Sequence, residues 1–176
     1  RYLKIDKEER FVSSKTNWLL SAFNETTKDE GYVEYNPITN SIKVLDKGPY
    51  NYSRPEKAEL SSNIIFTKES FLDFPNLRIS DLSLKNQIVL SDANPQQKDY
   101  NWGTIELVNW ISLDGKELTG LLVKPENFDS NKKYPLIVNF YERSSDDLNN
   151  HRSPSYGRST INYNFYASRG YVIFNP

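Results

Sequence analysis

The chain has 176 residues, enough for one large domain or two small ones, and its aromatic fraction of 14% argues against disorder. The formal net charge is −1 and no basic tract stands out, which argues against nucleic acid as the main partner. There is no cysteine and only one histidine, so disulfides and thiol catalysis are excluded, and a zinc site would need His151 plus carboxylates alone. We expect no metal and no cofactor.

No segment has the length and apolar character of a membrane span, and residues 1–10 are charged where a signal peptide would be apolar. The chain starts on Arg1 and not on Met, which leaves open whether a targeting segment precedes it. The lack of cysteine suits an oxidising compartment and the cytosol equally well. The compartment is therefore open, with a periplasmic or secreted parent among the options.

The first hundred residues read as short strands separated by turns. Their apolar or alternating segments are 18–23, 32–35, 41–45, 63–67, 77–82 and 87–91. The turn at 36–40 predicts a hairpin between the second and third of these. Short strands at near-regular spacing favour a sandwich, a barrel or a propeller, although no exact repeat marks propeller blades.

Residues 92–103 (DANPQQKDYNWG) are rich in turn formers and give the best candidate boundary. Beyond them, segments 104–112 and 118–124 flank Asp114-Gly115, a strong tight-turn signal, and we expect a second hairpin there. The two predicted domains are thus 1–103, which is β-rich, and 104–176, which is α/β.

A different pattern follows in the last forty residues. Segment 136–141 and Tyr171–Phe174 are continuous apolar strands, and residues 159–169 between them read as a helix. Ser159 or Thr160 can cap this helix, and Gly170 stands where it would end. Strand, helix and strand predict a parallel pair buried on both faces. Because the sheet has only begun at residue 176, we expect the chain to be a fragment that can self-associate through an incomplete sheet.

The order and spacing of several motifs in the second part resemble prolyl oligopeptidase-type serine peptidases, and most closely the dipeptidyl peptidase IV and acylaminoacyl peptidase branch. The motifs are Trp110–Leu118 (WISLDGKEL), Gly120–Pro125 (GLLVKP), Phe128-Asp129, Lys132–Pro135 (KKYP) and Ser168–Val172 (SRGYV). The resemblance covers residues 104–176 well, and residues 58–103 are more weakly similar to the closing strands of the family's β-propeller. It implies closing propeller strands followed by the first strands and first helix of an α/β-hydrolase domain.

The resemblance also implies a function for the parent protein: hydrolysis of short peptides by acyl transfer to a serine. In the family, the strand that ends in PLIV finishes on a tyrosine whose hydroxyl helps to form the oxyanion hole, and by resemblance this residue is Tyr141. Glu142-Arg143 replace the small pair that usually follows the tyrosine. No Gly-x-Ser-x-Gly occurs in the chain, so the resemblance places the catalytic Ser, Asp and His beyond residue 176 and implies that the chain alone is inactive.

Plainer interpretations stand beside these. Tyr141 can be an ordinary strand-end tyrosine, and His151 an exposed residue that is structural or has no role. Asp146-Asp147 with Glu142 suggest a cation site, but we expect a solvated acidic loop there. Glu25, Asp29 and Glu30 match no family motif, and we assign them no role. As a whole, the chain can also be a non-catalytic β-rich binding module that has inherited a hydrolase-like segment.

Overall fold

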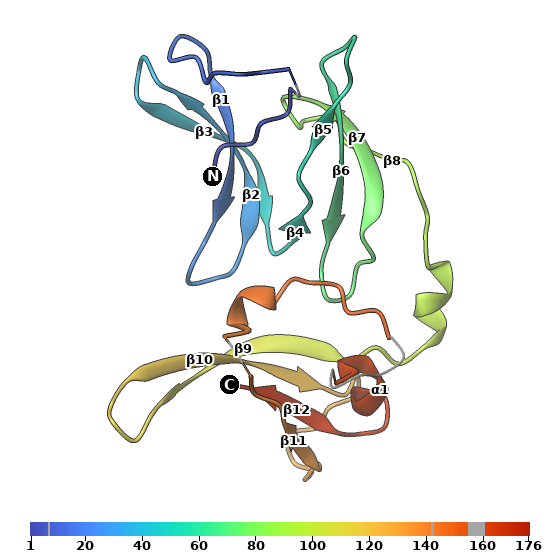
Figure 1. Cartoon of the computed structure of the whole chain (residues 1–176). Coiled ribbons are helices and arrows are strands. Elements are labelled where there is room, and N and C mark those ends of the chain that lie inside the picture. Colours follow the sequence, from blue (N-terminus) through green and yellow to red (C-terminus); the bar gives the residue numbers. More distant parts are fainter. Residues whose placement is uncertain (7, 142, 155–160) are drawn as a thin grey trace. The chain divides into compact units, whose positions relative to one another are not determined.

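The structure is a computed structural model that describes residues 1–6, 8–141, 143–154 and 161–176. It is mostly β-sheet with little helix. Its elements are β1 (Trp18–Phe23), β2 (Glu30–Asn36), β3 (Ser41–Gly48), β4 (Asn51–Tyr52), β5 (Glu56–Lys57), β6 (Asn63–Glu69), β7 (Asn76–Asp81), β8 (Ile88–Val89), β9 (Thr104–Ile111), β10 (Glu117–Lys124), β11 (Leu136–Val138), α1 (Tyr163–Ala167) and β12 (Val172–Asn175), with short 3-10 helices at Pro95–Asp99 and Ser145–Asp147 (Figure 1). We call residues 1–70 with 74–93 the first unit, and residues 71–73 with 94–176 the second unit.

The first unit begins with an antiparallel sheet of order β1-β2-β3. The expected hairpin between β2 and β3 is confirmed, and Asn36 explains its turn because its Oδ1 accepts from the N–H groups of Ile38 and Thr39 at 2.9 and 3.0 Å. The strands come very close at Gly31, where an added Cβ would lie 2.2 Å from the carbonyl oxygen of Asp46. Only glycine therefore fits this position without moving a strand.

The second sheet of the first unit has the order β4-β6-β7-β8, and β5 pairs with β6 as well. Its inner residues join those of the first sheet in one apolar core. The buried members of this core are Leu3, Tyr32, Tyr52, Ile64, Phe66 and Leu84. Tyr32 makes edge-to-face contacts with Tyr52 and Phe66, at ring-centroid distances of 5.1 and 5.8 Å. Aromatic side chains thus stabilise this core.

The second unit contains a mixed sheet of order β11-β12-β10-β9 (Figure 1). Its antiparallel β9–β10 hairpin is confirmed, with Gly115 at a φ of +80° in the turn, as the Asp114-Gly115 signal predicts. The parallel pairing of β11 with β12 and the helix between them are also confirmed. The buried core of this unit consists of Phe71, Trp102, Val123, Tyr163, Ala167 and Ile173.

Three expectations for the last forty residues need correction. The first strand, expected over 136–141, is only Leu136–Val138, and it is not buried on both faces, since Leu136 is 56% and Val138 49% exposed. The reason is that β11 is the outermost strand of its sheet. The helix is described only over Tyr163–Ala167, and the capping positions Ser159 and Thr160 lie outside the described residues. The second strand begins one residue later than expected, at Val172.

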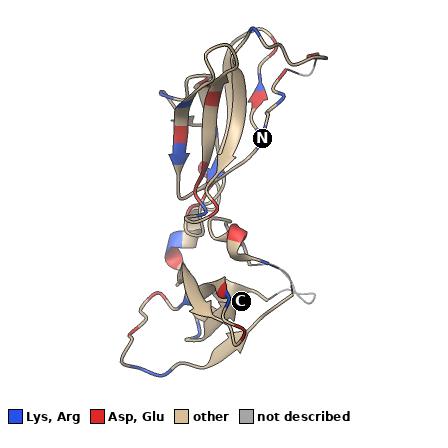
Figure 2. Ribbon diagram, turned by 90° about the vertical axis from the view of Figure 1, so that its left-hand side faces the viewer, with Lys and Arg blue, Asp and Glu red and all other residues tan. Residues whose placement is uncertain are grey.

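Charged residues of both signs are distributed over both units, as Figure 2 shows. This agrees with a formal net charge of −1. Over the ranges that the structure describes, no helix has the length and apolarity needed to cross a membrane.

Candidate functional site

The strand-end tyrosine that the sequence singles out lies just beyond β11. Asn139 still bonds to the neighbouring strand, its N–H donating to the carbonyl of Phe174 at 2.9 Å, and the chain then leaves the sheet. The side chain of Tyr141 is 92% exposed, and its hydroxyl has no hydrogen-bond partner among the described residues. Tyr141 is therefore a free donor at the carboxyl end of a parallel strand, where the sites of open α/β sheets lie. Glu142, the first residue of the pair that replaces the family's small residues after the tyrosine, lies outside the described residues.

The acidic residues that follow Tyr141 are paired with arginines. Arg143 Nη2 lies 2.9 Å from Asp146 Oδ1, and Arg152 Nη2 lies 3.3 Å from Asp147 Oδ2. Both carboxylates remain about half exposed, at 45% and 49%. In the described ranges, no three His, Cys, Asp or Glu side chains gather in a geometry that could hold a metal ion.

His151 is partly buried, which corrects the expectation of an exposed side chain from its polar neighbours. Its ring stacks on Trp102 at a centroid distance of 5.2 Å, and its Nε2 lies 2.9 Å from Gln97 Oε1. Because the amide nitrogen of Gln97 donates to the carbonyl of Leu72 at 2.6 Å, its oxygen is the acceptor, and the neutral imidazole carries its proton on Nε2. Burial lowers the pKa of His151, opposed by the negative charge of Asp73. Through these contacts, His151 holds its loop against the core of the second unit.

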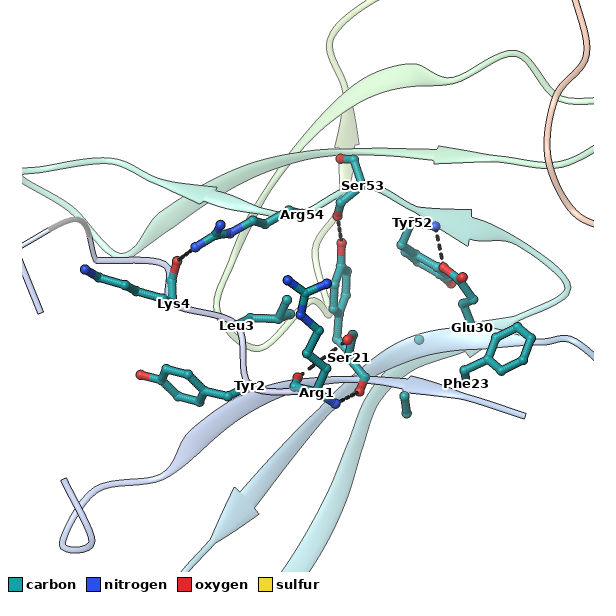
Figure 3. Close-up of a pocket in the computed structure, with 13 residues that line it drawn as sticks. Arg1, Tyr2, Leu3, Lys4, Ser21, Phe23, Glu30, Tyr52, Ser53 and Arg54 are labelled. Carbon is teal, nitrogen blue, oxygen red and sulfur yellow. Dashed lines mark hydrogen bonds between the residues drawn. The ribbon is translucent and has the colours of Figure 1, made fainter. Parts of the chain in front are cut away.

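A pocket of about 490 Å³ lies in the first unit (Figure 3). Thirteen residues line it, contributed by the first four residues, β1, β2 and the segment around β4. Glu30 and Tyr52 occupy one end, where Glu30 Oε2 accepts from the backbone N–H of Tyr52 at 3.0 Å. At the other end, Arg54 Nη2 donates to the carbonyl of Lys4 at 2.6 Å. The pocket thus has an acidic and a basic end.

The titratable groups at the acidic end are perturbed by burial. Burial raises the pKa of the Glu30 carboxyl, partly offset by the N–H of Tyr52. Burial, together with nearby carboxylates, raises the pKa of Tyr32 and Tyr52 as well. Both phenols therefore stay neutral, and Tyr32 donates to the backbone carbonyl of Ser53. These groups are suited to polar binding, and none is arranged as a nucleophile with a base.

Next to this pocket, a carboxylate joins the two sheets of the first unit. Asp46 Oδ2 on β3 lies 3.3 Å from Lys68 Nζ on β6, and it accepts from Gln87 Nε2 at 2.7 Å. The ammonium group also lies 4.3 Å from the ring centroid of Tyr50. Both charged side chains are largely buried, with 15% and 17% exposure.

Sequence patterns did not identify either the pocket or this ion pair. Glu30 lies in an acidic stretch of the sequence, but the residues that line the pocket with it come from distant segments. Arg54 and Lys4, which are in contact, are 50 positions apart. Asp46 and Lys68 lie on different sheets. A local pattern carries no signal for such contacts.

The fold of the chain is similar to that of several solved peptidases. A putative dipeptidyl aminopeptidase IV from Bacteroides ovatus matches 99% of this chain and 24% of its own chain, with a TM-score of 0.61 and 20% identity. Dipeptidyl peptidase 4 of Porphyromonas gingivalis matches 93% of this chain and 23% of its own, with a TM-score of 0.60 and 14% identity. The acylaminoacyl peptidase of Pyrococcus horikoshii matches 90% of this chain and 23% of its own, with a TM-score of 0.56 and 19% identity.

The predicted resemblance is thus confirmed at the level of the fold, and the chain spans no more than 24% of the length of these three structures. No protein-family model and no curated protein sequence matches it.

Proposed function

We propose that the chain is part of a serine peptidase of the prolyl oligopeptidase type. In this proposal, residues 1–103 are closing strands of a β-propeller, and residues 104–176 are the first part of an α/β-hydrolase domain. The observation that carries it is the similarity of fold to peptidases of this type over 90% or more of the chain. The motifs of residues 104–176 support it independently of the fold.

The parent enzyme would cleave short peptides by acyl transfer. A serine outside this chain attacks the carbonyl carbon of the peptide bond while a histidine takes its proton. The amine leaves with that proton, and water then hydrolyses the acyl-enzyme ester to release the acid and restore the serine. None of these steps requires a cofactor.

Tyr141 would stabilise the negative charge on the carbonyl oxygen in the tetrahedral intermediate. Its position supports this role in two respects: it lies three residues beyond Val138, the last residue of the parallel strand β11, and its hydroxyl is free to donate. A donor held beside a rigid strand needs little reorganisation when the charge develops.

The test uses a longer polypeptide that contains this chain and the sequence that follows it in the gene. We expect a serine-directed fluorophosphonate to label this polypeptide covalently and to abolish its turnover of a chromogenic dipeptide substrate. The 176-residue chain alone should neither be labelled nor turn over the substrate above a heat-treated control. A longer polypeptide that remains unlabelled and inactive while it is folded would refute the peptidase and favour a β-rich binding module.

A further inference from the structure

The turn between β9 and β10 contains the only Asp-Gly pair of the chain, Asp114-Gly115. The turn is open to solvent: Leu113 is fully exposed, and a Cβ added at Gly115 would meet no atom within 4 Å. Because glycine has no Cβ, its backbone nitrogen can approach the side chain of the preceding residue without a steric clash. The turn thus places a carboxyl group next to an unhindered amide.

These two groups can react with each other. The nitrogen of Gly115 attacks Cγ of the protonated Asp114 side chain, and the N–H proton leaves with the carboxyl hydroxyl as water. The product is a five-membered succinimide ring. Water then opens the ring at either carbonyl: one opening restores aspartate, and the other gives isoaspartate, in which the main chain passes through Cβ and Cγ. The reaction consumes no reagent besides the water that it first releases.

In the folded chain, neighbouring side chains hold both oxygens of the Asp114 carboxylate. The Ser112 hydroxyl donates to Oδ1 at 2.5 Å, and Lys116 Nζ lies 2.7 Å from Oδ2. The hydrogen bonds from Lys116 and Ser112 lower the pKa of Asp114. Because the ionised carboxylate is a poor electrophile and has no hydroxyl to release, these contacts oppose ring closure.

The attacking nitrogen is held as well. The N–H of Gly115 donates to the carbonyl of Ser112 at 2.9 Å. The Ser112 hydroxyl is itself fixed, since its oxygen accepts from the backbone N–H of Lys116 at 3.0 Å. Ser112 therefore bonds to both partners of the reaction, the carboxylate through its side chain and the amide through its backbone.

We propose that Asp114 is a site of isoaspartate formation, and that Ser112 and Lys116 restrain this reaction in the folded chain. The contacts then have a role that stability measurements do not reveal, since an exposed ion pair stabilises a fold only little. Isoaspartate lengthens the main chain of the tight turn by one methylene group, which should loosen the pairing of Ile111 with Glu117 beside it. The proposal does not depend on the peptidase activity of the parent.

The test compares variants incubated for increasing times at neutral pH and physiological temperature. A protein isoaspartyl methyltransferase labels the isoaspartate with a radioactive methyl group, and mass-spectrometric fragmentation assigns the modified position. Ser112→Ala and Lys116→Ala should accumulate isoaspartate at position 114 several-fold faster than the wild-type chain. The control is Gly115→Ala, in which the added methyl group hinders the attack, and its isoaspartate content should stay near background.

A second comparison separates the effect of the contacts from that of the local sequence. In urea, where the contacts are absent, the wild-type chain and Ser112→Ala should form isoaspartate at equal rates, and both should react faster than the folded wild-type chain. Equal rates in the folded wild type and both variants, or a folded wild type as fast as the unfolded chain, would overturn the restraint by Ser112 and Lys116. Absence of isoaspartate at position 114 even in the unfolded chain would overturn the site itself.

Discussion

Removal of the Asp46 carboxylate should destabilise the first unit strongly. In Asp46→Ala, Lys68 keeps its charge in a largely buried position, and its ammonium group loses the oxygen 3.3 Å away. The amide nitrogen of Gln87 loses its acceptor at 2.7 Å as well. The intact pair contributes little net stability, because the attraction between the charges only offsets the cost of removing them from water. Removal of one partner abolishes the attraction but leaves the other charge buried, so the variant loses much more stability.

The expected loss follows from the exposure of the two side chains. Removal of one member of a buried ion pair costs about 3–5 kcal/mol. Lys68 and Asp46 retain 15% and 17% exposure, and Gln87 keeps a weaker bond to the carbonyl of Leu84 at 3.2 Å, so water and this bond relieve part of the penalty. We therefore expect a loss of about 3 kcal/mol in the free energy of unfolding, at the lower end of that range.

Two measurements check this value. Urea denaturation gives the free energy of unfolding of the chain, and hydrogen exchange measured by mass spectrometry on peptides from β3 and β6 localises the loss to the first unit. The double variant Asp46→Ala/Lys68→Met removes the stranded charge and should recover at least about 1 kcal/mol relative to Asp46→Ala. Lys116→Ala, at an exposed ion pair in the β9–β10 turn, is the matched control and should leave the unfolding midpoint unchanged. Asp46→Ala within about 0.5 kcal/mol of the wild type would refute the argument.

Three further predictions concern single positions. Gly31→Ala should lower the free energy of unfolding, measured by urea denaturation, by about 2–3 kcal/mol, because the added Cβ would lie 2.2 Å from the Asp46 carbonyl oxygen. In the control Gly115→Ala, the added Cβ meets no atom within 4 Å, and the loss should be only about 1 kcal/mol because φ is positive there. Because burial lowers the pKa of His151, the unfolded chain binds the proton at a higher pH than the folded chain does. The free energy of unfolding should therefore fall as the pH drops below about 6.5, the usual pKa of histidine, and His151→Gln should flatten this dependence. In the active longer polypeptide, Tyr141→Phe should reduce kcat roughly 100- to 1000-fold with little change in KM, and a normal kcat in steady-state assays would contradict its proposed role.

The elements that sequence patterns predict well are those whose signals are local. β1 was predicted with its observed bounds, Trp18–Phe23, because an apolar run between polar loops specifies it. Both hairpins follow from turn residues such as Asp114-Gly115, and the parallel pair follows from two apolar runs around a helix. In each case, the information lies within a few residues.

The features that were missed depend on contacts distant in sequence. β4 and β5 have two residues each, too few for any periodicity. His151 looks exposed beside Asn150 and Arg152, yet Trp102 covers one face of its ring. An apolar run like that of β11 has the same appearance at the edge of a sheet as at its centre, so its exposure could not be predicted.

The discontinuous course of the chain has a consequence for modularity. Residues 71–73 belong to the second unit, although the residues on both sides of them belong to the first. Phe71 is a buried member of the second core, and its carbonyl accepts from the indole N–H of Trp102 at 2.8 Å. A gene fusion or recombination event that joins residues 94–176 to another protein would leave a cavity where Phe71 packs and an indole without its acceptor. Loss of such an aromatic side chain costs about 3–5 kcal/mol, so residues 94–176 could not be transferred at a single breakpoint without compensating changes.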